Sequence, residues 1–323
     1  MWRSPSEPRR LVRSVLRRFV DTRDLDTTFV RAEVINRDAL DTLHARRLTS
    51  SFFLFLNYMD AHEPYNPPAP FNRKFGSAPI GWTQEDYGDL KEEVLTKNRS
   101  VPPETSRHLT AMYDGAIAYE DAQIGQLFEQ LEKDGLFDDS LIIVTSDHGE
   151  GLTGVHGFGH PGSVYQDHIG IPLVIKNPHQ REAHVVQDPV SQIDLMPTVL
   201  STVGIPMTSK LAGIDLRATD QPTSRELLSA SYPCLSVHYP ALNRTVLALI
   251  SKNMKYIQST AGSRELYNLE LDPGERSNLF TDNSPEAAVR ITSLTAMLKM
   301  IPQFHSKTEP DALRPLRGLG YVQ

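Results

Sequence analysis

The stretch that most constrains the fold is a run of apolar and β-branched residues, 141–145, which leads through Ser146 into Asp147-His148-Gly149-Glu150. A short apolar run of this kind predicts a strand that is buried inside a parallel sheet. Polar side chains at the C-terminal end of such a strand lie where open α/β sheets place their binding sites. Because a carboxylate and an imidazole both suit a divalent cation, Asp147 and His148 are candidate ligands for one shared metal ion.

The sequence around this strand predicts an α/β pattern. Residues 52–58, Phe-Phe-Leu-Phe-Leu-Asn-Tyr, predict a second buried strand, and a long amphipathic helix opens at Pro103 and ends at Gly135. Strand, helix and strand in this order favour a βαβ unit and a parallel sheet. Residues 66–103 are rich in proline, glycine and polar residues and predict a long loop, functional or poorly ordered. Three further elements are expected: a helix at 30–47, a strand at 171–175 and a helix at 192–203.

A different pattern begins near residue 225, where short alternating strands with polar turns are typical of a small antiparallel sheet. We expect these strands at 232–238, 245–251, 255–258 and 265–269, followed by a helix at 285–298. The predicted fold is therefore α/β, with a mostly parallel central sheet flanked by helices and a small C-terminal antiparallel sheet. The predicted boundaries are 1–28 for a basic helix and linker, 29–220 for the α/β domain, 221–285 for the antiparallel subdomain, and 286–323 for a helix and tail.

Composition narrows the class of protein. Hydrophobic residues make up 39% of the 323-residue chain, which is enough for a sizeable core. The net charge of −7 argues against nucleic-acid binding driven by bulk charge. The single cysteine, Cys234, excludes an intrachain disulfide, and we expect it to be a small buried residue.

Neither a membrane span nor a signal peptide is visible. No apolar run approaches the roughly 18 residues that suggest a span. Residues 1–20 are Arg-rich with apolar positions at helical spacing, and they lack the uninterrupted apolar core of a signal peptide. We expect a basic surface helix packed on the domain, with a transit peptide or a membrane-surface helix as alternatives. The sequence does not determine the cellular compartment of the protein, and the cytoplasm is the default expectation.

Six motifs follow one another in a fixed order between about residues 30 and 280, and each is weakly specific alone. They are Phe52-Phe-Leu-Phe-Leu-Asn-Tyr-Met-Asp-Ala-His-Glu-Pro-Tyr65, Tyr113-Asp-Gly-Ala-Ile-Ala-Tyr-Glu-Asp121, Ser146-Asp-His-Gly-Glu150, Ile171-Pro-Leu-Val174, Ile193-Asp-Leu-Met-Pro-Thr198, and Glu265-Leu-Tyr-Asn-Leu269 with Asp272-Pro-Gly-Glu275. In order and spacing, the chain resembles the sulfatases of the alkaline-phosphatase-like superfamily. This resemblance implies that superfamily's fold and the hydrolysis of sulfate monoesters.

Two parts of the family pattern do not stand in this sequence. A sulfatase begins with a strand that ends in paired metal-binding aspartates, and it then presents Cys-x-Pro-Ser-Arg, whose cysteine becomes the formylglycine nucleophile. Cys234 lies in Pro233-Cys-Leu-Ser-Val237, without the downstream proline and arginine, so formylglycine cannot form in this chain. The chain therefore resembles the C-terminal two-thirds of a sulfatase.

The resemblance assigns roles to five residues. Asp147 and His148 match the family's second pair of metal ligands, for Ca²⁺ or Mg²⁺, and because two ligands are few we expect weak or absent binding. His62 matches the histidine that contacts the sulfate ester and assists the departing oxygen. His160 stands where the family has a sulfate-binding lysine, and we expect it to donate a hydrogen bond without a fixed charge at neutral pH. His156 is a candidate supporting residue for substrate binding.

Two further residues, Glu63 and His168, are assigned no part in the chemistry. Glu63 follows His62 directly, and we expect it to be solvated rather than catalytic. His168 lies in Gln166-Asp-His-Ile169, and we expect a structural role for it.

Three functions remain open at this point. The first is hydrolysis of a sulfate ester, either a small molecule or a sulfated glycan, with a nucleophile supplied from outside this chain. The second is a non-catalytic remnant or binding module, which is favoured for the chain in isolation because nothing in it supplies the nucleophile. The third is a relative that acts on phosphate esters or phosphonates. Because an incomplete sheet exposes an edge and apolar faces, we expect the chain to be marginally stable, a homo-oligomer, or partnered by the missing N-terminal half.

Overall fold

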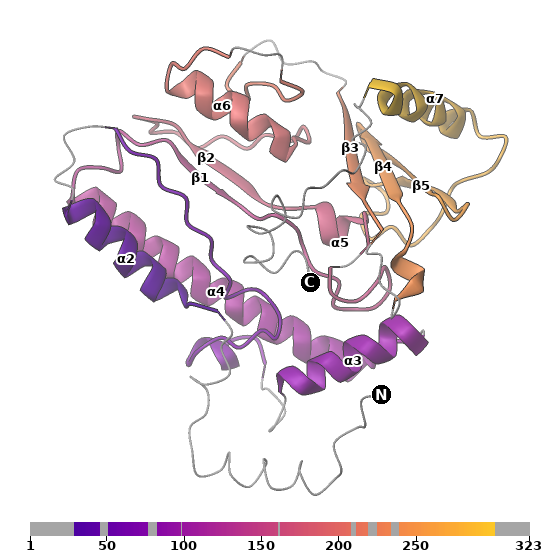
Figure 1. The fold of residues 1–323 in the computed structure, drawn as a ribbon, viewed down its shortest axis with the longest axis horizontal. Coiled ribbons are helices and arrows are strands. Elements are labelled where there is room, and N and C mark those ends of the chain that lie inside the picture. The colour runs from indigo at the N-terminus through magenta and orange to yellow at the C-terminus, as the bar shows by residue number, and fades with distance from the viewer. Residues whose placement is uncertain are drawn as a thin grey trace, which may run out of the picture.

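The protein is described by a computed structural model, shown in Figure 1. The structure describes residues 29–45, 51–76, 83–97, 99–160, 162–207, 211–218, 225–233 and 239–300. The predicted basic helix within 1–28, Cys234 and the tail beyond 300 lie outside the described residues, and the predictions made for them stay predictions. In the described residues, no helix is long and apolar enough to cross a membrane.

Two helices form one side of the molecule. Helix α2, Ala32–Ala45, packs along the 31-residue helix α4, Pro103–Lys133. Their contact buries Leu43 against Leu127 and Leu131. Helix α4 begins with a proline in its first turn, where the missing N–H costs nothing, and Gly135 at φ +71° follows its end. Both helices confirm the sequence prediction. Amphipathic spacing and terminal signals are local properties of a segment, so the sequence alone is enough to reveal them.

The central sheet differs from the prediction. Strands β1, Ile142–Thr145, and β2, Leu173–Lys176, form a two-stranded antiparallel ladder in which Ile142 lies opposite Lys176. Every strand pair that the structure describes is antiparallel, so the expected parallel sheet is not shown. The chain returns from β1 to β2 through the short helix α5, Gln166–Ile169, and loops, rather than through a long crossover helix. Figure 1 shows this ladder between α6 on one side and α2 and α4 on the other.

The prediction of a buried strand at residues 52–58 is wrong for the described structure. The segment is assigned to no strand, and the side chains of Phe53 and Phe55 are 82% and 78% exposed. Only Leu56, which packs on the α2–α4 core, and Tyr58, whose hydroxyl donates to Asn36 Oδ1 at 2.6 Å, are anchored to the helices. An apolar run predicts burial, but burial requires a neighbour, and the described residues place none on the other face of this segment.

The predicted loop at 66–103 contains a 3₁₀ turn, Phe71–Arg73, and a helix, α3, Gln84–Lys97. Helix α3 is a correction, and its start carries a recognisable signal. Thr83 N donates to Asp86 Oδ2 at 2.7 Å and Asp86 N donates to Thr83 Oγ1 at 3.1 Å, which is the reciprocal pattern of a capping box. Tyr87 of α3 then joins a core that includes Tyr65 and Phe158.

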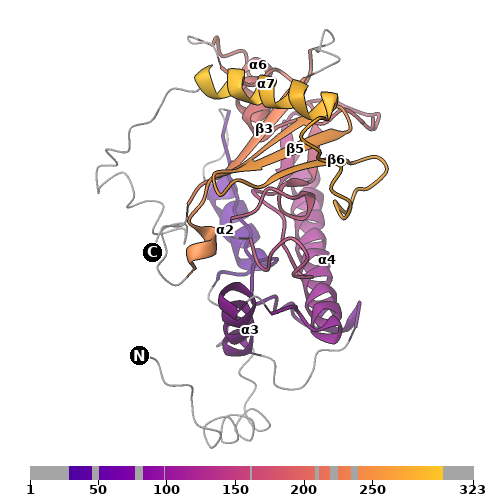
Figure 2. The same cartoon turned by 90° about the vertical axis from the view of Figure 1, so that its right-hand side faces the viewer.

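The C-terminal part is a four-stranded antiparallel sheet in the order β3-β4-β5-β6, as predicted. Its strands are Glu226–Ser231, Val246–Ser251, Met254–Ser259 and Arg264–Asn268. Helix α7, Pro285–Met300, covers one face of this sheet (Figure 2). Leu294 of this helix is buried in one cluster with Tyr256. The first strand lies at 226–231 rather than at the predicted 232–238, where residues 234–238 fall outside the described structure.

Helix α6, Leu195–Thr202, follows a 3₁₀ turn, Gln192–Asp194, and confirms the helix predicted at 192–203. Asp194, at the start of α6, is fully buried. Its carboxylate accepts hydrogen bonds from both terminal nitrogens of Arg225, at 2.6 and 2.7 Å, and from Ile214 N at 2.9 Å, and it thereby holds these segments together. The predicted domain boundaries are not tested by this arrangement and stay a prediction.

Candidate active site

Three imidazole rings, two from the loop after β1 and one from the turn after residues 52–58, meet beside the C-terminal end of β1. The ring centroids of His148 and His160 are 4.3 Å apart, and those of His62 and His160 are 5.5 Å apart. His148 follows β1 directly, His62 lies in the turn after the extended segment 52–58, and His160 ends the loop after Glu150. The sequence prediction placed these three histidines in one site, and the structure brings them together.

Close backbone approaches hold this loop in place. Gly149 N donates to His168 O at 2.7 Å, and a Cβ at Gly149 would lie 2.3 Å from the backbone oxygen of Asp167. Only glycine fits this contact. Gly151 and Gly159 then exchange backbone hydrogen bonds of 3.0 and 2.9 Å, which closes the loop that carries His160. The glycines of the sequence motif therefore position the loop rather than contribute chemistry.

Asp147 and His148, the predicted pair of metal ligands, lie side by side after the end of β1. His148 Nδ1 lies 2.8 Å from the carbonyl oxygen of Gly149, and because a carbonyl only accepts, Nδ1 donates this hydrogen bond and Nε2 is the ring nitrogen that remains for a cation. That Nε2 lies 3.7 Å from Asp147 Oδ1, and the Asp147 side chain is 59% exposed. One carboxylate oxygen and one imidazole nitrogen at this spacing fit two positions of a divalent-cation shell, whereas Ca²⁺ takes about six to eight oxygens.

Glu150 lies beneath the histidines and holds His160. Its side chain is only 4% exposed, and its Oε2 lies 3.4 Å from His160 Nδ1. The hydrogen bond with Glu150 outweighs burial and raises the pKa of the His160 imidazole above its usual value. This shift is toward the charged imidazolium, and the expectation that His160 carries no fixed charge at neutral pH stays a prediction.

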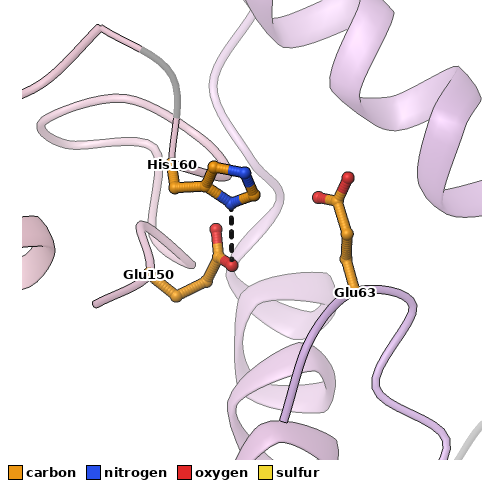
Figure 3. A group of neighbouring side chains, drawn as sticks. All are labelled: Glu63, Glu150 and His160. Atoms are coloured by element: carbon orange, nitrogen blue, oxygen red, sulfur yellow. Dashed lines mark hydrogen bonds and ion pairs between the residues drawn. The ribbon is translucent and has the colours of Figure 1, made fainter. Parts of the chain in front are cut away.

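Glu63 is not the solvated residue that the sequence suggested. Lys91 of α3 donates to both of its carboxylate oxygens, at 2.7 and 3.0 Å. Burial alone would raise the pKa of Glu63, but the Lys91 ammonium outweighs it and holds that pKa below its usual range. Figure 3 shows the Glu150 carboxylate below the His160 ring and the Glu63 carboxylate beside it, and one ligand atom from each of the three residues lies within 4.8 Å of the others.

Lys91 is the residue at this site that sequence reasoning missed. It lies in α3, within the segment that was predicted to be a loop. The Thr83–Asp86 capping box is the signal that would have revealed the helix. Nothing local would have revealed that Lys91 reaches Glu63, because that contact is set by the packing of Tyr87 on the core.

His156 lies apart from the three rings and faces the C-terminal sheet. Its ring stacks on Tyr165 at a centroid distance of 4.1 Å, its Nε2 lies 3.1 Å from the backbone oxygen of Glu275, and its Nδ1 lies 3.5 Å from Asp167 Oδ2. The Asp167 contact outweighs burial and raises the pKa of His156. His156 thus joins the active-site loop to the C-terminal sheet, and its predicted part in substrate binding remains a prediction.

Asp167 and His168 belong to the same connection. Burial opposes ionisation of Asp167, yet the hydrogen bonds from His156 and His168 lower its pKa strongly. His168 is 3% exposed, and its Nε2 lies 2.9 Å from Gly159 O. This burial agrees with the structural role expected for His168.

Comparisons with known proteins identify the family. The Sulfatase family model matches residues 12–205, more than half of the chain, and a model described as N-sulphoglucosamine sulphohydrolase, C-terminal, matches residues 154–302. The chain is 26% identical over 268 residues to the uncharacterized sulfatase YidJ of Escherichia coli K12, a match that covers 80% of this chain and 53% of YidJ.

Two solved structures show the same fold. The phosphonate monoester hydrolase of Silicibacter pomeroyi matches with a TM-score of 0.65 and 24% identity over 86% of this chain and 62% of its own. A structure in complex with its substrate D-glucosamine-2-N,6-O-disulfate matches with a TM-score of 0.50 and 23% identity over 71% of this chain and 48% of its own. The chain spans about half the length of the curated relatives it matches. With more than half of its residues matched by the family model, the chain belongs to the sulfatase family.

Proposed function

We propose that this chain carries the anion-binding and acid–base part of a sulfate-ester hydrolase site. The observation that supports this most is the meeting of His148 and His160, from the loop after β1, with His62, from the turn after residues 52–58. Family membership supports sulfate monoesters as the substrate class. The solved relative with a disulfated glucosamine supports sulfated sugars as one form of that substrate.

His62 is the proposed proton donor for the departing oxygen. Its Nδ1 lies 2.9 Å from the carbonyl oxygen of Glu63, so the Nδ1 proton is engaged there, and the proton given to the departing oxygen would be a second one, carried by Nε2. In sulfate-ester hydrolysis the S–O bond to the alcohol breaks, and water supplies the oxygen added to sulfur and the proton taken up by the alcohol. An imidazole passes protons readily because its pKa lies near neutrality.

His160 is the proposed sulfate-binding residue in place of the family lysine. Glu150 occupies its Nδ1 and favours the imidazolium, which leaves Nε2–H to donate to a sulfate oxygen. Asp147 and His148 would hold a divalent cation, Ca²⁺ or Mg²⁺, and such an ion, when bound, stabilises negative charge on the substrate oxygens.

The family's nucleophile motif, Cys-x-Pro-Ser-Arg, does not stand in these 323 residues. We therefore infer that the chain alone binds sulfate but does not turn over a sulfate ester, and that a nucleophile from other polypeptide is needed for hydrolysis. The second candidate is hydrolysis of phosphonate or phosphate esters. The fold of the Silicibacter pomeroyi phosphonate hydrolase favours it, because phosphonate monoesters present a similar tetrahedral anion.

The test compares binding with turnover. The purified chain is titrated with inorganic sulfate and with phenylphosphonate by calorimetry, and is assayed with 4-nitrophenyl sulfate in excess Ca²⁺ or Mg²⁺. We expect sulfate binding that falls at least tenfold in His160→Ala, and no turnover.

The matched control is His179→Ala, because the His179 side chain is exposed and pairs with the exposed carboxylate of Asp139, away from the site. Turnover that is lost in His62→Ala would contradict the inactivity of the isolated chain. The absence of sulfate binding, or preferential binding of phenylphosphonate, would contradict the sulfate assignment.

A further inference from the structure

Glu150 is a buried carboxylate whose surroundings are incomplete. Its side chain is 4% exposed, and its Oε1 has no hydrogen-bond partner among the residues that the structure describes. Its Oε2 lies 3.4 Å from His160 Nδ1, whereas a good N–H···O hydrogen bond spans about 2.7–3.2 Å. Because a buried charge without close partners is costly, this carboxylate indicates that a further cation or donor belongs beside it.

Glu63 brings a second carboxylate to the same place. In Figure 3 its carboxylate lies beside the His160 ring, and the Glu150 carboxylate lies below that ring. One ligand atom from each of the three residues lies within 4.8 Å of the others. Lys91 donates to both Glu63 oxygens and so compensates the charge of that carboxylate, while His160 is the described ion-pair partner of Glu150. The described members of this cluster thus carry two negative charges and the fixed positive charge of Lys91.

Two tyrosine hydroxyls lie near this cluster. Tyr65 and Tyr87 are 1% and 3% exposed, and neither hydroxyl has a hydrogen-bond partner in the described part of the chain. Burial first, and then the nearby carboxylates of Glu150 and Glu63, raise the pKa of both hydroxyls, so the hydroxyls lie close enough to sense these charges. Buried hydroxyls normally find a partner. Their presence beside an incompletely satisfied carboxylate indicates that a small polar or charged species completes the cluster.

The donor atoms of the cluster favour Zn²⁺. An imidazole nitrogen suits Zn²⁺, whereas Ca²⁺ and Mg²⁺ take oxygen ligands. In a tetrahedral zinc site, bonds of about 2.0–2.2 Å place neighbouring ligand atoms roughly 3.3–3.5 Å apart. The 3.4 Å between Glu150 Oε2 and His160 Nδ1, which is long for a hydrogen bond, matches one edge of such a tetrahedron. Glu63 supplies the third ligand atom, and its side chain, 20% exposed, can adjust to the zinc spacing.

We propose that Glu63, Glu150 and His160 form a zinc site, separate from the Asp147–His148 pair, with a fourth position open to water. Zn²⁺ binds His160 through Nδ1 and takes the place of the proton between this nitrogen and Glu150. The Nε2–H of His160 then remains available to donate to an anion. The tyrosine hydroxyls beside the cluster are suited to hydrogen-bond the water or the ligating carboxylates.

Lys91 fits this assignment as an outer hydrogen-bond donor rather than as a competitor for the site. Each carboxylate oxygen has two lone pairs, so Glu63 can accept from Lys91 and bind Zn²⁺ at the same time. Ligating carboxylates are commonly hydrogen-bonded in this way, which fixes their orientation. The alternative is a cluster without metal, in which Lys91 and a charged His160 balance the two carboxylates. The inference goes beyond the proposed function, since zinc binding requires neither sulfate nor turnover.

The experiment titrates the purified, chelator-treated full chain with Zn²⁺ by calorimetry, and with Co²⁺ by visible absorption, which reports four-coordinate geometry. We expect one tight Zn²⁺ per chain and a Co²⁺ spectrum of the tetrahedral type. Glu150→Gln and His160→Ala should each weaken Zn²⁺ binding at least about tenfold. Asp147→Asn, which removes a ligand of the neighbouring pair, should leave the Zn²⁺ affinity unchanged. The matched surface control is His179→Ala, which removes an exposed histidine 3.5 Å from Asp139 and should also leave it unchanged.

Circular dichroism checks that each variant folds. If Glu150→Gln does not, Glu63→Gln makes the same test at a carboxylate that is 20% exposed. Two results would overturn the proposal: no Zn²⁺ binding by the unsubstituted chain, or Zn²⁺ binding that Glu63→Gln and Glu150→Gln leave unchanged. A chain that binds Zn²⁺ but not sulfate contradicts only the proposed function, and a chain that binds sulfate but not Zn²⁺ contradicts only the zinc site.

Discussion

At the scale of a single residue, Gly149 allows two backbone segments of the site to approach each other closely. It follows the candidate ligands Asp147 and His148, and a Cβ here would lie 2.3 Å from the backbone oxygen of Asp167. Because backbone is costly to move, Gly149→Ala should destabilise the fold by about 1–3 kcal/mol in urea unfolding. Gly125→Ala, in α4 with open space at its Cβ, is the control and should stabilise by up to about 1 kcal/mol. Equal effects of the two changes would refute the close approach.

The Asp167–His156 pair gives stability a defined dependence on pH. The pKa of Asp167 is lowered in the folded state, so its contribution is present above the ordinary aspartate pKa of about 4 and is lost as pH falls through the folded value. The pKa of His156 is raised, so its contribution is present below about 6.5 and is lost as pH rises through the folded value. The pair therefore stabilises most between about pH 4 and 6.5.

Thermal unfolding of Asp167→Asn tests this dependence. The difference in unfolding midpoint from the unsubstituted chain should be largest between about pH 4 and 6.5 and should shrink on both sides. A difference that is constant from pH 4 to 9 would show that the pair does not titrate in this way.

At the scale of elements, helix α3 depends on its cap. The reciprocal bonds of Thr83 and Asp86 satisfy backbone groups at its start, and the helix carries Lys91 to Glu63. Thr83→Ala should cost about 1 kcal/mol in urea unfolding. It should also speed hydrogen exchange in α3. Thr96→Ala, which removes only an exposed bond to Glu92 O near the other end of the helix, is the control and should have little effect.

What the sequence predicts well is local. The helices α2, α4 and α6 and the hairpins of the C-terminal sheet follow from spacing, caps and turns, which lie within each segment. The sequence also predicts that one site is formed by four residues near the ends of segments: His62, Asp147, His148 and His160. The sequence does not predict features that depend on contacts between segments. Residues 52–58 have the composition of a buried strand but no described strand beside them, and β1 pairs antiparallel with β2. The Glu63–Lys91 contact likewise depends on the packing of α3.

The buried pair Lys255–Glu275 ties the active-site loop to the C-terminal sheet. Both side chains are essentially inaccessible, and Lys255 Nζ lies 2.7 Å from Glu275 Oε1. Glu275 Oε2 also accepts from Gln166 N at 2.5 Å, at the start of α5. Lys255→Met should cost about 3–5 kcal/mol in urea unfolding, because it leaves a buried charge unpaired. Adding Glu275→Gln should recover part of that loss, and a double variant less stable than the single one would contradict this account.

At the scale of the whole molecule, the two sheets differ in how completely they are enclosed. The C-terminal sheet has α7 on one face and the residues around Val164 on the other, and Ala248, Leu249 and Tyr256 are fully buried within it. The β1–β2 ladder carries the site but contains no buried strand residue on β1. Burial of apolar area supplies most of the stability of a fold, so the enclosed sheet should resist local opening more than the open sheet does.

Native-state hydrogen exchange should therefore separate the two sheets. Amides of β4 and β5 should exchange only through global unfolding, whereas those of β1 and β2 should exchange at least about tenfold faster through local opening, because less apolar contact is lost when they open. The control is helix α4, whose buried face on α2 should keep its central amides protected. Equal protection of β1 and β4 would mean that the open sheet is as stable as the enclosed one.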